Sequence, residues 1–250
     1  MNDIKDKIIT VKKQTINSYV FRPMLFSTPM VQAILEGRKT QTRRKIKHQP
    51  PKGNYKFGIN VTGTRCKENG LFHWLGIDDE IEYKVTDSNQ PYFKCPVNIG
   101  DIIWVRETFA FAPFTDETLH FYPELKNHNF IYKAGPNYPN IKWKPSLFMP
   151  KKACRLFLEI TDIRIEMLNE ISESDAVAEG ILDMFYGKDI AGNAYFNYMD
   201  KKGGWDSVAE DAIHSYQTLW QKINGINSWS KNPFVWVYDF KVVECPEGFL

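Results

Sequence analysis

The chain has 250 residues, of which 43% are hydrophobic and 25% are charged, a composition typical of globular proteins that excludes a disordered or fibrous chain. Its 32 Lys and Arg against 30 Asp and Glu give a formal net charge of +2. No segment approaches the roughly 20 apolar residues of a membrane helix, the start has no signal-peptide core, and the four cysteines are scattered without a C-x-x-C pair. We therefore expect a cytoplasmic protein with no membrane contact, no metal and no cofactor.

Positive charge is concentrated at the start of the chain. Residues 1–50 carry a net charge of +8, and the remaining residues therefore carry −6, much of it between Glu159 and Asp183. Lys and Arg neutralise phosphates and release counterions, so this density suits a phosphate-rich partner, although a solvated charged face gives the same composition. The basic cluster consists of Arg38, Lys39, Arg43, Arg44, Lys45 and Lys47.

The first predicted element is a helix over 29–36, followed by a strand over 40–46. The pair Thr28-Pro29 is a typical helix start, apolar residues then recur at helical spacing, and Gly37 supplies a left-handed stop. In the strand, threonines alternate with longer polar residues, which is the period of an extended chain.

Beyond this point the pattern predicts more strands than helices. A short helix begins after Ser172, whose side chain can cap it, and ends at Gly180, while a longer helix carries an apolar stripe and ends before Gly225. The order of the elements predicts an α+β protein with a small β-barrel. The expected strands cover 55–61, 80–85, 102–109, 129–134, 155–165 and 234–243, the expected helices cover 173–179 and 207–224, and an irregular loop covers 183–205.

The segment Gly37-Arg38-Lys39-Thr40-Gln41-Thr42-Arg43-Arg44 resembles the signature of the ASCH family. In that family a short helix ends in G-[RK]-K-T, and a strand with a further Thr and Arg follows. The opening Arg22-Pro23-Met24-Leu25-Phe26 is similar to that of the long, phage- and prophage-associated members. Four later segments resemble the family in the same order, namely 100–105, 156–165, 171–179 and 233–241.

The resemblance implies a single α+β domain over 1–250, a PUA-like β-barrel flanked by helices and enlarged by long insertions. It also implies a nucleic acid, RNA above all, or a modified nucleoside as the partner, because the family is associated with both. The core would cover about 20–47, 99–108, 153–182 and 207–243, with insertions at about 48–98, 108–150 and 183–206.

A small bacterial branch of the family hydrolyses N4-acetylcytidine with a Lys, a Thr and a Glu, which Lys39, Thr42 and Glu179 match by motif. Thr42 would be the nucleophile, Lys39 would take its proton, and Glu179 would protonate the leaving amine. Side chains alternate along a strand, so Lys39 and Thr42 share a pocket only if Lys39 belongs to the turn before the strand or if a bulge separates them. The resemblance and the basic cluster assign contacts to nucleic acid or substrate to Arg38, Thr40, Arg43, Arg44 and Lys45.

Three classes of function remain open from the sequence. The protein can be a binding module for nucleic acid or a nucleoside. It can be an enzyme that hydrolyses an acylated base or, as a variant, cleaves RNA. It can also be a phage accessory or assembly protein in a bacterial host, which acts through contacts with phage or host proteins. The sequence alone does not choose between RNA, DNA and a free nucleoside, and it does not give the oligomeric state.

Overall fold

The structure is a computed structural model that describes residues 20–50, 55–59, 71–78, 81–84, 93–112, 129–138, 140–183, 196–197 and 211–250. The first half of the chain contains β1 (Phe21–Leu25), α1 (Thr28–Leu35), β2 (Gln41–Lys45), β3 (Tyr55–Ile59), β4 (Leu71–Asp78), β5 (Ile81–Lys84), β6 (Phe93–Lys94), β7 (Ile102–Arg106) and β8 (Phe109–Phe111). The second half contains β9 (Phe130–Tyr132), η2 (Ser146–Phe148), η3 (Lys151–Ala153), β10 (Phe157–Met167), η4 (Leu168–Glu170), α4 (Glu173–Ala178), β11 (Leu182–Asp183), β12 (Phe196–Asn197), α5 (Ala212–Asn224) and β13 (Phe234–Val243).

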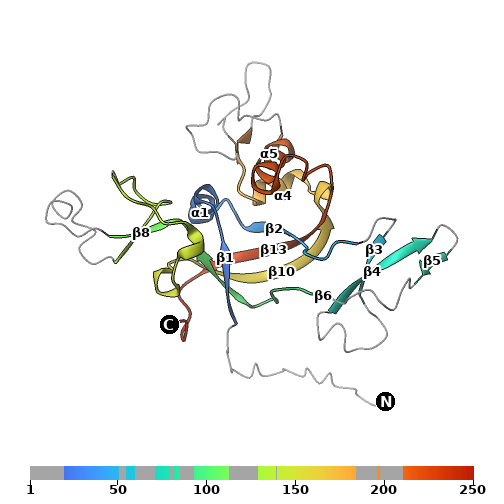
Figure 1. The fold of residues 1–250 in the computed structure, drawn as a ribbon, viewed down its shortest axis with the longest axis horizontal. Coiled ribbons are helices and arrows are strands. Elements are labelled where there is room, and N and C mark those ends of the chain that lie inside the picture. The colour runs from blue at the N-terminus through green and yellow to red at the C-terminus, as the bar shows by residue number, and fades with distance from the viewer. Residues whose placement is uncertain are drawn as a thin grey trace, which may run out of the picture.

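A curved sheet of five strands forms the centre of the fold (Figure 1). The strand order is β1-β7-β10-β13-β2, in which β1 runs parallel to β7 and the other neighbours are antiparallel. The helices α1, α4 and α5 lie on one side of this sheet, and the hairpin strands β3, β4 and β5 extend away from it. The protein is therefore α+β with a core made mostly of sheet.

The main core lies between the sheet and the helices. The central strand β13 has four consecutive buried residues, which explains the continuous apolar run that predicted it, and its predicted bounds of 234–243 are confirmed. Each large apolar side chain buried here stabilises the fold by about 1.5–3 kcal/mol. Members of this core are Val31 and Ile34 of α1, Val105 of β7, Leu158 and Ile160 of β10, Val235 and Val237 of β13, and Leu219 of α5.

The predicted helices are confirmed in the described part of the chain, with small shifts of their ends. The helix α1 begins one residue earlier than predicted, at Thr28, and α4 ends at Ala178, one residue early. Asp211 caps α5 by accepting a hydrogen bond from the amide of His214. The predicted start of α5 at residue 207 lies outside the described residues.

The prediction of one continuous strand over 102–109 is wrong, because the chain leaves the sheet after Arg106. Glu107 is buried, and its carboxylate accepts hydrogen bonds from Nε and Nη2 of Arg155 at 2.8 and 3.0 Å. The next strand, β8, begins at Phe109, whose amide donates a hydrogen bond to the carbonyl of Lys144. The chain thus leaves the five-stranded sheet at the paired and buried Glu107, and β8 belongs to a different sheet.

The insertion at 48–98 contains antiparallel strands, as expected. The predicted strands at 55–61 and 80–85 are confirmed in their described parts as β3 and β5, their remaining residues lie outside the described part of the chain, and the unpredicted strand β4 lies between them. Sequence analysis also missed β1. Most of the expected loop at 183–205 lies outside the described residues, although its two short strands β11 and β12 pair with each other.

The five-stranded sheet ends at β1 on one side and at β2 on the other. Among the described strands these two edges do not pair with each other, so a closed barrel is not observed. They are nevertheless close, because Nη2 of Arg44 on β2 donates a hydrogen bond to the carbonyl of Leu25 on β1 at 2.8 Å. The sheet is therefore curled until its edges face each other across a seam.

Candidate active site

Lys39 lies in the turn that follows α1, before β2 begins. Gly37 has a φ of 75°, a left-handed conformation that glycine adopts without strain, and the amides of Arg38 and Lys39 both donate to the carbonyl of Ala33, at 2.9 and 3.0 Å. Lys39 then forms an isolated antiparallel bridge with Glu179. Because Lys39 precedes the strand, strand alternation does not separate its side chain from that of the predicted nucleophile.

Lys39 and Glu179 form a buried ion pair. Nζ of Lys39 lies 2.6 Å from Oε2 of Glu179 and also donates to the main-chain carbonyl of Glu179 at 2.8 Å, and the two side chains are 0% and 2% exposed. Burial lowers the pKa of Lys39, the contact with Glu179 opposes this without cancelling it, and Arg44 and Arg43 lower the pKa further. The pair therefore combines an amine of lowered pKa with a carboxylate, which suits acid–base chemistry.

Gly180 allows the ion pair to form at close range. It has a φ of 100°, and a Cβ at this position would lie 2.9 Å from Cβ of Ala33 and 3.0 Å from Cβ of Lys39. Arg38 reinforces the approach, because its Nη1 donates to the carbonyl of Gly180 at 2.5 Å. Arg38, predicted as a substrate contact, thus holds the turn before β2 against the end of α4.

Thr42 and Glu179 line one small cavity of about 60 Å³. Thr42 comes from β2 and is buried, and α5 contributes Tyr216 and Trp220 to the lining. Nε1 of Trp220 and Nε of Arg43 are both buried, and neither atom has a hydrogen-bond partner among the described residues. The structure thus brings the predicted nucleophile and the predicted acid to one small cavity, and Nζ of Lys39 contacts the acid from outside its lining.

Arg43 lies in the interior and not at the surface. Its side chain is 0% exposed, with Nη2 at 2.8 Å from Oε2 of Glu166 and 3.1 Å from Oδ2 of Asp175. Nη1 lies 3.4 Å from Oε1 of Glu179 and also donates to Gln41. A buried guanidinium needs such partners, so Arg43 contacts carboxylates of the protein where the sequence predicted a phosphate.

A second arginine, Arg164 on β10, completes this carboxylate network, and sequence analysis missed it. Arg164 contacts Glu166, lies 3.1 Å from Oδ1 of Asp175 and reaches Oδ2 of Asp239. Gln41 donates to Asp175 at 3.1 Å and to Asp239 at 2.7 Å, so the network ties β2 to β10, β13 and α4. The many acidic residues between Glu159 and Asp183 were the sequence signal for this network, but no sequence pattern showed that they pair with the basic strand.

Arg44 lies where three cavities meet. Its guanidinium carbon is 5.0 Å from the ring centroid of Phe26, and it lines the small cavity together with a cleft of about 920 Å³ and a groove of about 710 Å³. The small cavity shares Met30 with the cleft and Lys45 with the groove. The cleft is lined by residues that include Phe26, Met30, Lys133, Trp143 and Ser146, and the groove by residues that include Arg22, Met24, Lys45, Lys47, His48 and Lys94.

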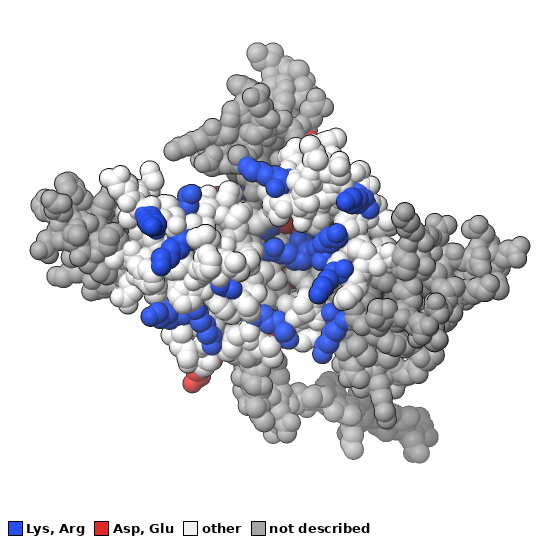
Figure 2. Space-filling model, viewed as in Figure 1, with Lys and Arg blue, Asp and Glu red and all other residues white. Residues whose placement is uncertain are grey.

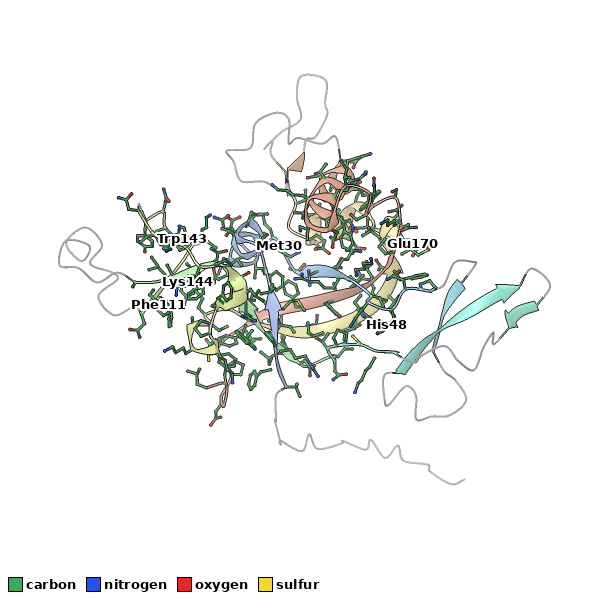
Figure 3. The ribbon with its side chains drawn as sticks, viewed as in Figure 1. Met30, His48, Phe111, Trp143, Lys144 and Glu170 are labelled. Atoms are coloured by element: carbon green, nitrogen blue, oxygen red, sulfur yellow. The ribbon has the colours of Figure 1, made fainter. Side chains whose placement is uncertain are left out.

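Among the described residues, the linings of the cleft and the groove have only Leu25 and Arg44 in common. Figure 3 places Met30 between Trp143, which lines the cleft, and His48, which lines the groove. Figure 2 shows Lys and Arg gathered over the middle of this same view, with few Asp or Glu visible. The remaining predicted contact, Thr40, is exposed, and its main chain bonds to Ala178 and to Phe240 at 2.9 Å each.

Within the part of the chain that the structure describes, no group of three or more His, Cys, Asp or Glu is arranged to hold a metal ion. Among the described helices, none has the length and apolar character needed to cross a bilayer. Comparison of the chain with family models, with curated proteins and with solved structures found no match in any of the three.

Proposed function

We propose that this protein hydrolyses a short acyl amide on a nucleobase, with Thr42 as the nucleophile. The observation that carries the proposal is the buried ion pair of Lys39 and Glu179, whose carboxylate lines the same cavity as Thr42. A PUA-like fold of the ASCH type, enlarged by insertions, is part of the proposal. It is supported by the order of the matched segments and by the curled sheet with α1 and β2 next to the site.

The first half of the reaction transfers the acyl group to the protein. It begins when the proton that Lys39 carries in the ion pair passes to Glu179 across the 2.6 Å contact, which leaves Lys39 as an amine and Glu179 as the acid. Oγ1 of Thr42 attacks the acyl carbonyl while its proton passes to Nζ of Lys39, and the bond between the acyl carbon and the base nitrogen breaks as Glu179 protonates that nitrogen. The base leaves with its free amino group, and the acyl group remains as an ester of Thr42.

The second half restores the protein. A water attacks the ester carbonyl and gives a proton to Glu179, while Lys39 returns its proton to Oγ1 of Thr42 as the ester bond breaks. The products are the free acid and the neutral pair with which the cycle began. Neutral Lys39 is required at the start, and burial, which lowers its pKa, favours that form.

The volumes of the two cavities fit the two parts of this substrate, the acyl group and the nucleoside. A cavity of about 60 Å³ has room for a few heavy atoms, which matches an acetyl group and excludes a base. The adjoining cleft of about 920 Å³ lies within the roughly 300–1,000 Å³ of typical ligand sites and takes the base and sugar. Arg44, between the two, is placed to contact the acyl oxygen or a phosphate.

The test is the release of cytidine from N4-acetylcytidine by the parent protein and by Thr42→Ala. We expect release by the parent and a loss of at least 100-fold in the variant, with partial recovery in Thr42→Ser, which keeps a hydroxyl. Thr161→Ala, which removes an exposed threonine from the bulge in β10, is the matched control and should release cytidine at the parental rate. No release by the parent would refute the hydrolase and leave a binding protein, and equal release by the parent and Thr42→Ala would refute Thr42 as the nucleophile.

A further inference from the structure

The groove of about 710 Å³ follows the seam between the two edges of the sheet. Its lining runs along the whole of β1 on one side and continues from the end of β2 to His48 on the other, with Trp236 and Tyr238 of β13 between them. The bond from Arg44 to the carbonyl of Leu25 spans the seam where the groove meets the cleft. The proposed reaction needs only the small cavity and the cleft, so the groove is an additional site.

The charges around the groove indicate an anionic ligand. Lys45, Lys47 and Lys94 are exposed at its lining, and among the residues that the structure describes no Asp or Glu lines either the groove or the cleft. Arg22 also lines the groove but is paired with Asp101 at 2.6 Å, so the three lysines are the cations most open to a ligand. Lysine binds phosphate groups as a compact point charge, and a row of such charges suits a phosphodiester backbone.

The arrangement of the cavities indicates a ligand longer than one nucleotide. A nucleoside whose acyl group reaches the small cavity occupies the cleft beside Arg44. The groove, whose described lining has only Leu25 and Arg44 in common with that of the cleft, continues from there to Lys47 and His48. The cleft also offers Trp143, on which a neighbouring base can stack. One nucleoside cannot fill both the cleft and the groove, whereas a strand in which the reacting base has neighbouring nucleotides can.

The enclosed cavity further selects a single strand. An acyl group on a base within a duplex lies inside the base stack, and a protein reaches it only after the base is unpaired and turned outward. Resting on the proposed function, we infer that the substrate is a single strand of nucleic acid, with its reacting base in the cleft and the phosphates of the adjacent nucleotides in the groove along the seam.

The inference is tested by binding, which needs no turnover. Fluorescence anisotropy measures the affinity of the full chain for a labelled 12-nucleotide single strand, as RNA and as DNA, over a range of salt concentrations. The groove variant is Lys45→Ala/Lys47→Ala/Lys94→Ala. Three lost phosphate contacts should reduce the slope of log affinity against log salt by about 2, equivalent to about 100-fold weaker binding at 0.1 M salt when the two lines meet near 1 M.

The matched control removes three exposed lysines that lie outside the groove and the cleft, as Lys152→Ala/Lys231→Ala/Lys241→Ala. The control should bind the strand with the parental slope. Equal losses in the two triple variants would show a general charge effect and overturn the inference, as would tighter binding to a duplex of the same length. Circular dichroism of both variants confirms that they are folded.

The failures of the two proposals are distinguishable. If the parent releases cytidine from N4-acetylcytidine but the groove variant binds the strand as the parent does, the hydrolase stands and the strand in the groove is refuted. If the groove variant loses strand binding and the parent releases no cytidine from nucleoside or strand, the hydrolase is refuted and the groove stands as a nucleic-acid site. A preference for the RNA or the DNA strand identifies which nucleic acid the groove takes.

Discussion

Replacing Lys39 by methionine removes the cation from an ion pair whose two side chains are 0% and 2% exposed. Truncating one partner of such a pair typically costs about 3–5 kcal/mol, because the other charge stays buried. Glu179 keeps a distant contact with Nη1 of Arg43 at 3.4 Å, which places the expected loss at the lower end of that range. The main-chain carbonyl of Glu179 also loses its donor, a further cost of about 1–3 kcal/mol. Lys39→Met should therefore lower the free energy of unfolding by about 4 kcal/mol.

The double variant Lys39→Met/Glu179→Met separates the ion pair from simple packing. It leaves neither charge buried, so its loss of stability should be at least 1 kcal/mol smaller than the sum of the two single losses. Urea unfolding, followed by tryptophan fluorescence, gives each free energy, with similar m values as the check for two-state behaviour. Additive losses, or a loss below 1 kcal/mol in Lys39→Met, would refute the buried pair. If a single variant fails to fold, Glu179→Gln, which keeps the shape of the side chain, replaces it in the cycle.

The pH dependence of the same measurement has a defined sign. The pKa of Lys39 is lowered in the folded protein, so the unfolded chain binds more protons between that pKa and the usual lysine value of about 10.4. The stability that comes from this group is therefore complete above pH 10.4 and is lost as the pH falls through the lowered pKa. Relative to the parent, Lys39→Met should show a smaller rise in stability between neutral pH and pH 10. A larger rise in the variant would contradict the assigned direction.

Three further predictions concern the same region. Gly180→Ala should destabilise the protein more than Gly37→Ala in urea unfolding, because both have positive φ but only the Cβ at Gly180 meets other atoms, and equal losses would argue against the close approach. Arg43→Met should cost about 3–5 kcal/mol at pH 7 and less at pH 4, because Gln41 and Arg43 lower the pKa of Asp175 and without Arg43 that carboxylate takes up a proton at a higher pH, and a cost that is constant with pH would contradict the network. The rate of cytidine release should fall as the pH rises through the lowered pKa of Lys39, because the pair then loses the proton that Glu179 gives to the leaving nitrogen, and a rate that rises through this range would contradict the mechanism.

Local sequence patterns were sufficient to predict those helices and strands whose bounds depend on their own residues. The apolar run of β13 predicted its bounds because a central strand is buried on both faces. The proline and glycine at the ends of α1 did the same for the first helix. In contrast, β1 contains Arg22 and Pro23, which are untypical of a strand. The proline is tolerated there because β1 is an edge strand of the sheet.

Long-range pairing decided what the sequence could not show. Arg43 belongs to the same basic cluster as Lys45, and only the fold brings it against Glu166 and Asp175, which lie 123 and 132 residues away along the chain. The motif placed Lys39 and Thr42 in the right order, but their approach to Glu179 depends on the end of α4 and on its close packing against the turn before β2. The geometry of the candidate site is therefore a property of the tertiary fold.

The open seam of the sheet has a consequence for solubility. Edge strands offer free amides and carbonyls to other chains, and proteins protect them with lysine and proline, which discourage the addition of a further strand. Here Pro23 lies on β1 and Lys45 ends β2, with the exposed Lys47 just beyond. Lys45 and Lys47 thus protect the β2 edge against association between copies of the chain, and a variant without them should be stored and assayed at low concentration.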